Sequence, residues 1–191
     1  DAPLASEPPS QPAPASFDLH QHLPAQPRRL LVMQTAFIGD VILALPVLQS
    51  LRTWYPAAEL VFLVRRGNEG LLANHPAVDR ILTWDKGRNK RRNLLRLAGE
   101  LHRTAFDGVI NLHRYFSTGL LVLASWAPVR AGFSAHPMAP LIYTHARPHR
   151  LSAPGETPIW HEVDRNRSLL GDGPPPATRR PRLFPSDADE A

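Results

Sequence analysis

Asp40 is the residue whose position in the sequence points most directly to chemistry. It follows Gly39 in a short polar turn between the apolar run Leu30 to Met33 and a long apolar helical pattern. Strand, glycine turn and helix form the opening of a βαβ unit, whose ligands bind beyond the carboxyl end of the strand. A carboxylate at that edge, beside a helix N-terminus that favours negative charge, is a candidate general base. The spacing alone favours a second role, capping of the helix.

A basic run is the second candidate site. Residues 86–96 include six basic side chains and no acidic one, and the run follows a predicted strand at the same sheet edge as Asp40. Arginine pairs with phosphates and carboxylates through its planar fork, although runs of charge are usually solvated surface. Both roles stay open for the four cations that we select as candidate ligands: Arg88, Lys90, Arg91 and Arg92.

Three more side chains follow predicted strands at this edge. His113 and Arg114 come after the fourth strand, and Arg65 ends the second. His113 could hydrogen-bond a ligand or serve as a structural histidine. His161 and Glu162 do not form a metal pair, because zinc needs three or four ligands and no second histidine lies one helical turn away. The sequence therefore predicts no metal and no bound cofactor.

The elements that must position these residues alternate between strand and helix. Short buried runs predict strands at 30–34, 60–64, 78–84, 109–112, 129–133 and 141–144. Helical patterns predict helices at 41–55, before residue 73, and at 91–104, 117–126 and 160–170. Pro46 must restart the first helix or kink it. This alternation predicts an α/β, Rossmann-like fold: a parallel sheet with helices on both faces.

Composition divides the chain into three parts. Residues 1–27 contain seven prolines and no glycine, which predicts a disordered tail. Residues 28–170 form the predicted domain, and the proline-rich residues 171–191 resemble an interdomain linker. Because the chain begins with Asp1, we expect a processed protein or a fragment. No apolar run reaches the roughly 18 residues of a membrane-spanning helix.

Charge is concentrated in the predicted domain. Residues 28–170 hold 19 Lys and Arg against 10 Asp and Glu, a net +9, whereas the segments before and after carry −3 and −1. A domain this basic indicates an anionic partner such as a phosphorylated lipid, a nucleotide or a nucleic acid. The basic run 86–96 has no aromatic residue for stacking on bases, which argues against nucleic acid. The chain has no cysteine, so disulfides and thiolate metal sites are excluded.

Several segments, taken together and in order, resemble one known family. The most specific is Gly39-Asp40-Val41-Ile42-Leu43-Ala44-Leu45-Pro46. The others are residues 51–52, 55–60, 74–81, 106–112, 130–133 and 161–170. Over about residues 28 to 185 they resemble the bacterial heptosyltransferases of glycosyltransferase family 9, which build the lipopolysaccharide inner core. The family usually has an aspartate and a glutamine near Asn111 and His113, and both are replaced here.

The resemblance implies a two-domain GT-B type enzyme, of which this chain is the N-terminal, acceptor-binding half. It implies that Asp40 is the catalytic base, and that the basic loop contacts an anionic acceptor of the Kdo–lipid A type. Arg65, His113 and Arg114 are further candidate contacts with this acceptor. The donor, a nucleotide sugar such as ADP-heptose, would be bound mainly by a second domain that this sequence lacks, so this half alone is expected to be inactive. The implied location is cytoplasmic, with peripheral contact to the inner membrane.

Two other functions fit parts of the sequence. The first is a non-catalytic, basic Rossmann-like module that binds an anionic ligand. The second is a phospho-receiver domain with Asp85 as phosphate acceptor, but such a domain needs an acidic pair after the first strand, where Asp40 stands alone.

Overall fold

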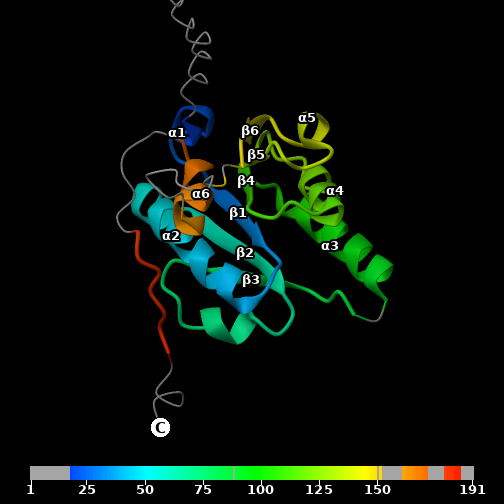
Figure 1. Cartoon of the computed structure of the whole chain (residues 1–191), viewed down its shortest axis with the longest axis horizontal. Helices are drawn as coiled ribbons and strands as arrows, with labels where there is room; N and C mark the ends of the chain where they lie inside the picture. Colours follow the sequence, from blue (N-terminus) through cyan, green and yellow to red (C-terminus); the bar gives the residue numbers. More distant parts are fainter. Residues whose placement is uncertain (1–17, 88, 150, 152–160, 172–178, 186–191) are drawn as a thin grey trace, which may run out of the picture.

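A single parallel sheet organises the chain (Figure 1). The computed structural model describes residues 18–87, 89–149, 151, 161–171 and 179–185. Within them the strand order is β3-β2-β1-β4-β5-β6, with every neighbouring pair parallel. The strands are β1 Arg29–Gln34, β2 Glu59–Arg65, β3 Arg80–Trp84, β4 Gly108–Asn111, β5 Val129–Phe133 and β6 His145–Arg147. The order reverses between β1 and β4, so the crevice for a ligand opens there.

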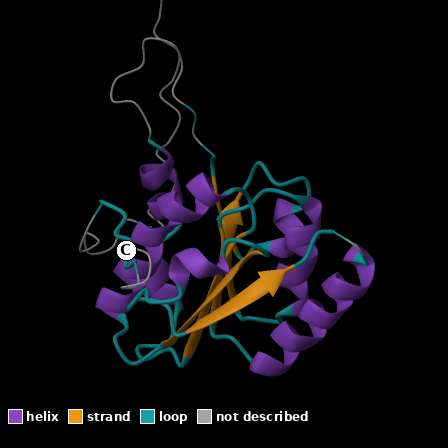
Figure 2. Ribbon diagram, turned by 90° about the horizontal axis from the view of Figure 1, so that it is seen from below, coloured by secondary structure: helices purple, strands orange, loops and turns teal. Residues whose placement is uncertain are grey.

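Helices cover both faces of the sheet (Figure 2). Side chains alternate along β1, so that Leu30 and Val32 join one apolar cluster and Leu31 and Met33 the other. The first cluster packs under α1 Leu19–His22, α2 Ile38–Trp54, the 3-10 turn η1 Glu69–Leu72 and α6 Glu162–Ser168. The second packs under α3 Lys90–Thr104, α4 Phe116–Ala124 and α5 Ala139–Ile142. The predicted α/β class with a doubly covered parallel sheet is confirmed.

The predicted sixth strand at 141–144 is wrong. Its first residues belong to α5, whose first turn accommodates Pro140, and the strand β6 starts at His145. The apolar residues that suggested a strand are buried for another reason. Tyr143 is buried against Gly132 of β5, where a Cβ atom would lie 2.2 Å from the tyrosine ring. The glycine therefore makes room for an aromatic ring after a short helix.

Helix α2 runs through Pro46 as one helix, so the proline does not restart it. Proline removes a backbone donor from a helix and displaces the turn before it. Asn166 of α6 is fully buried and donates from Nδ2 to the carbonyl of Leu43 at 3.2 Å, and Ser50 donates to the carbonyl of Pro46 at 2.6 Å. Helix α6 thus provides a donor one turn before the proline.

Residues 18–27 differ from the disordered tail that composition predicts for 1–27. Leu19 and Leu23 are buried in the core, and the Leu19 amide donates to the carbonyl of Leu170 at 3.0 Å. The side chain of Asp18 caps α1 by accepting from the amide of His20. Two buried leucines spaced one helical turn apart, the backbone hydrogen bond to Leu170 and a contact of 2.6 Å between His20 Nδ1 and the hydroxyl of Tyr55 anchor the segment. Residues 1–17 lie outside the described residues.

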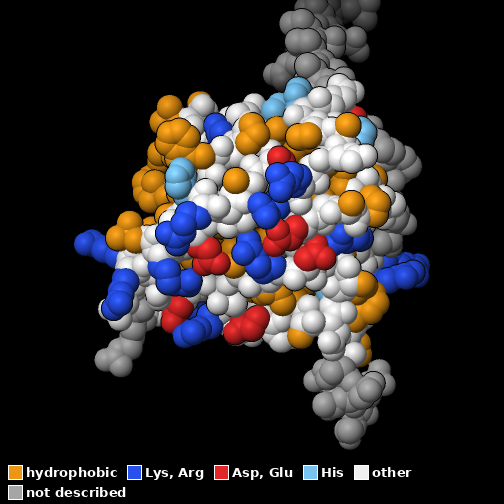
Figure 3. Space-filling view, turned by 180° about the vertical axis from the view of Figure 1, so that it is seen from behind, with side chains coloured by type: hydrophobic (Ala, Val, Ile, Leu, Met, Phe, Trp, Pro, Cys, Tyr) orange, Lys and Arg blue, Asp and Glu red, His pale blue; other side chains and the backbone are white. Residues whose placement is uncertain are grey.

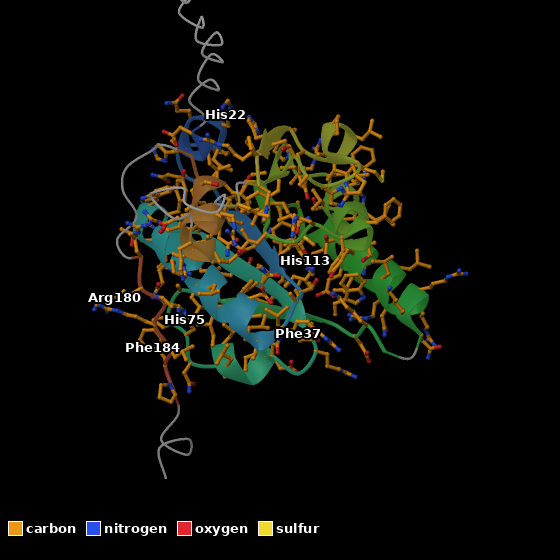
Figure 4. All side chains as sticks on the ribbon, in the orientation of Figure 1. His22, Phe37, His75, His113, Arg180 and Phe184 are labelled. Atoms are coloured by element: carbon orange, nitrogen blue, oxygen red, sulfur yellow. The ribbon has the colours of Figure 1, made fainter. Side chains whose placement is uncertain are left out.

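At the other end, residues 179–185 lie along α2 and the loop after η1. The ring of Phe184 meets His75 edge-on at 5.0 Å, and Arg179 forms an ion pair with Asp164 of α6 (Figure 4). These residues fall in the predicted linker, of which residues 172–178 are outside the described part. None of the helices in the described ranges combines the length and the apolar character of a membrane span.

Candidate functional site

A cavity of about 540 Å³ opens at the carboxyl edge of the sheet, beside the reversal between β1 and β4. The ends of β1, β2, β3, β4 and β6, or the loops that follow them, surround it together with the first turns of α2 and α6. Its lining consists of Gln34, Thr35, Ala36, Phe37, Asp40, Arg65, Lys86, Leu112, His113, Arg114, Tyr115, His149, Leu151, Glu162 and Arg165. The volume lies in the range of small-ligand sites and suits one or two sugar rings.

Asp40 lies in the first turn of α2 and lines the cavity. Its Oδ2 accepts a hydrogen bond from the amide of Phe37 at 3.2 Å, which ties the carboxylate to the helix N-terminus. Among the described residues no cation pairs with it. Asp40 is therefore both a capping residue and a carboxylate that faces the cavity, so the two roles left open by the sequence coexist.

Lys86 reaches the cavity from the end of β3. Its ammonium donates to the carbonyl of Thr35 at 2.7 Å and lies over the rings of Trp84 and Tyr115, at 4.8 and 5.8 Å from their centroids. Burial, together with the charges of Arg65 and Lys90, lowers the pKa of Lys86 to about 8. A negative ligand would favour the charged form of this lysine.

His113 is buried at the end of β4, on the wall of the cavity (Figure 4). Its Nδ1 lies 3.2 Å from the hydroxyl of Thr35, and its amide donates to Oδ1 of Asn111 at 3.1 Å. Burial lowers the pKa of His113 to about 4, with Lys86 as the next cause. The imidazole is therefore neutral at physiological pH, and it can exchange hydrogen bonds with a hydroxyl but cannot act as a cationic anchor.

The remaining charges give the cavity a positive balance. Arg65 lies over the ring of Phe37, with Cζ 5.7 Å from the centroid, and Arg114 is exposed at the rim. Arg165 pairs with Glu162, so these two largely cancel. Four cations against Asp40 and Glu162 leave a net +2, since burial lowers the pKa values of both lining histidines, His113 and His149. The site is suited to an anionic ligand.

The structure brings together only some of the residues selected from the sequence. Asp40, Arg65, His113 and Arg114 share the cavity. Lys90, Arg91 and Arg92 are exposed on the first turn of α3 and are not among the lining residues. Arg88 lies outside the described residues.

Other lining residues were not selected from the sequence: Lys86, Tyr115, His149, Glu162 and Arg165. Lys86 had a usable signal, since it stands two residues after the end of β3 and so must lie at the carboxyl edge. Glu162 and Arg165 had none, because only the packing of α6 on α2 brings that helix to the cavity.

Two other residues weighed from the sequence have structural partners. Asp85 pairs with Arg66 at 3.1 Å and accepts from the amide of Gly87, and it does not line the cavity. His161 caps α6, with its Nδ1 accepting from the amide of Val163 at 3.2 Å. In the described part of the chain, no three His, Asp or Glu side chains gather where a metal ion could bind.

Strand order, parallel pairing and a cavity at the reversal point together define a Rossmann-like domain. Comparison with known proteins narrows this class: the chain is a distant homologue of the lipopolysaccharide heptosyltransferases of glycosyltransferase family 9. No protein-family model matches it.

The individual relatives show how far the likeness extends. Lipopolysaccharide core heptosyltransferase OpsX of Haemophilus influenzae is 29% identical over 107 residues, 56% of this chain and 30% of that protein. Lipopolysaccharide heptosyltransferase 3 of Escherichia coli is 28% identical over 140 residues, 69% of this chain and 38% of that protein. The crystal structure of a family 9 glycosyltransferase from Veillonella parvula aligns with TM-score 0.65 and 25% identity, covering 81% of this chain and 42% of that one. The chain thus spans less than half the length of these relatives.

The low pKa of His113 predicts a loss of stability in acid. The unfolded histidine binds a proton near pH 6.5 and the folded one only near pH 4, so stability is full above 6.5 and falls as the pH drops toward 4. Between about pH 7.5 and pH 5 this amounts to about 2 kcal/mol. The free energy of unfolding, measured with urea at both pH values, should decrease by about 2 kcal/mol less in His113→Gln than in the wild-type chain. The other histidines are the same in both chains, so the difference reports on His113. Parallel losses would contradict the assignment.

Proposed function

We propose that this chain is the acceptor-binding half of an inverting glycosyltransferase. The reaction is transfer of a sugar, heptose from ADP-heptose, to an anionic lipopolysaccharide inner-core acceptor of the Kdo–lipid A type. The observation that carries the proposal is Asp40, a carboxylate that faces a cavity of sugar size bordered by cations. Homology to lipopolysaccharide heptosyltransferases supports the substrate class.

Asp40 has the chemistry of a general base in this transfer. An acceptor hydroxyl attacks the anomeric carbon of the donor, the bond from that carbon to the diphosphate oxygen breaks, and ADP leaves. Asp40 takes the proton that the hydroxyl loses. Its hydrogen bond to the Phe37 amide leaves lone pairs for this role and fixes the carboxylate in one orientation. Attack from the side opposite the leaving group inverts the anomeric configuration.

The cations of the cavity are the proposed contacts to the acceptor. Arg65, Lys86 and Arg114 surround the neutral His113. The arginines suit bidentate pairing with carboxylate or phosphate, whereas Lys86 supplies a point charge. The cavity has room for acidic sugars but not for acyl chains, so the lipid portion of the acceptor would remain outside. The donor would be bound mainly by a second domain, without which we expect no transfer.

Substitution of two neighbouring arginines, Arg65 and Arg66, should affect acceptor binding differently. We expect a Kdo oligosaccharide without acyl chains to bind the chain, and Arg65→Gln to weaken it by about tenfold or more, the loss of one charged hydrogen bond. Arg66→Gln is the matched control, because Arg66 pairs with Asp85 away from the cavity. Isothermal titration calorimetry at moderate salt measures both. Equal effects, or equal binding of any polyanion, would leave only a basic binding module.

Acceptor binding should also depend on the charge of Lys86. Because its pKa is about 8, affinity should fall by about tenfold between about pH 7 and pH 9 as the ammonium loses its proton. In Lys86→Arg the charge persists at both pH values, so the affinity should stay constant. The same titrations measure this change. A wild-type affinity that is constant across this range would refute the proposed contact.

The catalytic role of Asp40 requires transfer to be measured with the donor-binding domain present, in one chain or added separately. Asp40→Asn should keep acceptor affinity and lower kcat by about 10²–10⁴-fold, the usual contribution of a general base. Glu162→Gln offers a control, since that carboxylate lines the same cavity but pairs with Arg165. Transfer at the wild-type rate by Asp40→Asn would assign the residue to capping alone.

A further inference from the structure

Helix α4 exposes an unusual surface. Surface helices normally present polar residues to water, but the outward positions of α4 carry Phe116, Leu120, Leu123 and Ala124. Its one buried hydroxyl, Thr118, points inward to Asn111 at 3.3 Å. The helix has no charged residue. The helix is therefore apolar on its outer side as well as on its inner side, where Leu121 and Val122 are buried in the core.

The apolar surface continues onto the neighbouring elements. Leu95 of α3, Trp126 after α4 and Leu141 of α5 are 73, 78 and 71% exposed. Helix α4 contacts both α3 and α5, so these residues lie on one layer of the fold. We call this surface the α3–α5 face. Figure 3 shows hydrophobic side chains gathered over its α4 and α5 end.

Positive charge borders this apolar surface. Helix α3 carries Lys90, Arg91, Arg92, Arg96 and Arg103 against Glu100, a net +4. On the opposite face of the sheet, acidic and basic residues balance in both α2 and α6. The cations therefore concentrate on the same side as the exposed apolar residues, and Figure 3 shows Lys and Arg side chains next to the hydrophobic cluster.

Trp126 is the most informative residue of the α3–α5 face. It follows Ser125, the C-cap of α4, and lies in the left-handed region with φ 52°, and its amide donates to the carbonyl of Leu123. Glycine is the usual residue at this position because it adopts positive φ without strain. A tryptophan here is conformationally unfavourable and exposes a large ring to water. Its contact with His102, an edge-on arrangement at 6.0 Å, leaves most of the ring uncovered.

We propose that the α3–α5 face docks on the surface of an anionic phospholipid bilayer. Tryptophan prefers the boundary between headgroups and acyl chains, and leucine and phenylalanine beside it enter the outer acyl region. The cations of α3 pair with anionic headgroups. This combination fits a lipid surface better than a protein partner, because the apolar residues are spread over three helices and the charge of α3 beside them is net positive.

The position of this face also relates it to the cavity. Tyr115 lines the cavity, and Phe116, the next residue, begins the exposed stripe of α4. A bilayer on the α3–α5 face would therefore lie beside the cavity rim. The inference goes beyond the proposed function and needs no assignment of the cavity, since its test contains no sugar.

The test is flotation of the whole chain with vesicles of phosphatidylcholine, with and without phosphatidylglycerol. We expect binding to the anionic vesicles. Changing Lys90, Arg91 and Arg92 together to Gln should weaken the partition on the order of 100-fold, since each cation near an anionic leaflet contributes severalfold. The control changes Arg28, Arg66 and Arg180 to Gln, which alters the net charge equally outside the α3–α5 face. This control should bind like wild type.

Trp126→Gly tests the apolar part without risk to folding. Glycine suits the left-handed position, so the urea midpoint should stay the same or rise, while the partition falls by about tenfold or more. Absence of vesicle binding, or equal weakening by both charge triples, would overturn the proposal. A dimer in light scattering that Trp126→Gly disperses, without vesicle binding, would also overturn it and assign the face to a second copy of the chain.

Discussion

The site depends on the pairing of β1 with β2 on one side and β4 on the other. Because all three strands are parallel and in register, their carboxyl ends reach one edge of the sheet together. The chain leaves β1 toward α2 on one face and β4 toward α4 on the other, so the loops diverge and a cavity remains between them. At the amino edge, Asp107 closes the arrangement by accepting from the amides of Arg28 and Arg29.

Burial governs the chemistry of the cavity as much as charge does. Lys86 and His113 lie within one network around Thr35, and desolvation lowers both pKa values. The result is a neutral imidazole beside a lysine whose charge depends on the environment. Asp40 lies outside this network, at a helix N-terminus, where its Oδ2 accepts from the amide of Phe37. In the reaction that we propose, an anionic sugar would meet cations at the rim and the carboxylate of Asp40 at the reacting hydroxyl.

The homology, the cavity and the α3–α5 face together support our two proposals, transfer of a sugar to an anionic acceptor and docking of the chain on a bilayer. The relatives are heptosyltransferases of lipopolysaccharide, and the cavity has the size and charge for acidic sugars. Phe116 of α4 and the left-handed Trp126 leave 55 and 78% of their surface exposed, so the core covers neither side chain fully. If the acceptor is attached to a lipid, a bilayer docked next to the cavity would present its sugars to Asp40. Such docking would also give a role to Lys90, Arg91 and Arg92, which do not line the cavity.

Sequence alone determined the fold class and the position of Asp40 at the carboxyl edge of the sheet. Buried strands and a glycine turn are local patterns, and they fix which residues reach that edge. It also placed Arg65, His113 and Arg114 at that edge for the same reason. It did not determine that Lys86 turns inward while Lys90, Arg91 and Arg92 turn outward, since the direction of a cation depends on the rings and carbonyls that neighbouring strands supply. The strand expected at 141–144 failed because the packing of Tyr143 on Gly132 outweighs local propensity. Tertiary structure likewise decided that α6 completes the cavity and that residues 18–27 join the core, because both depend on contacts between segments far apart in the chain.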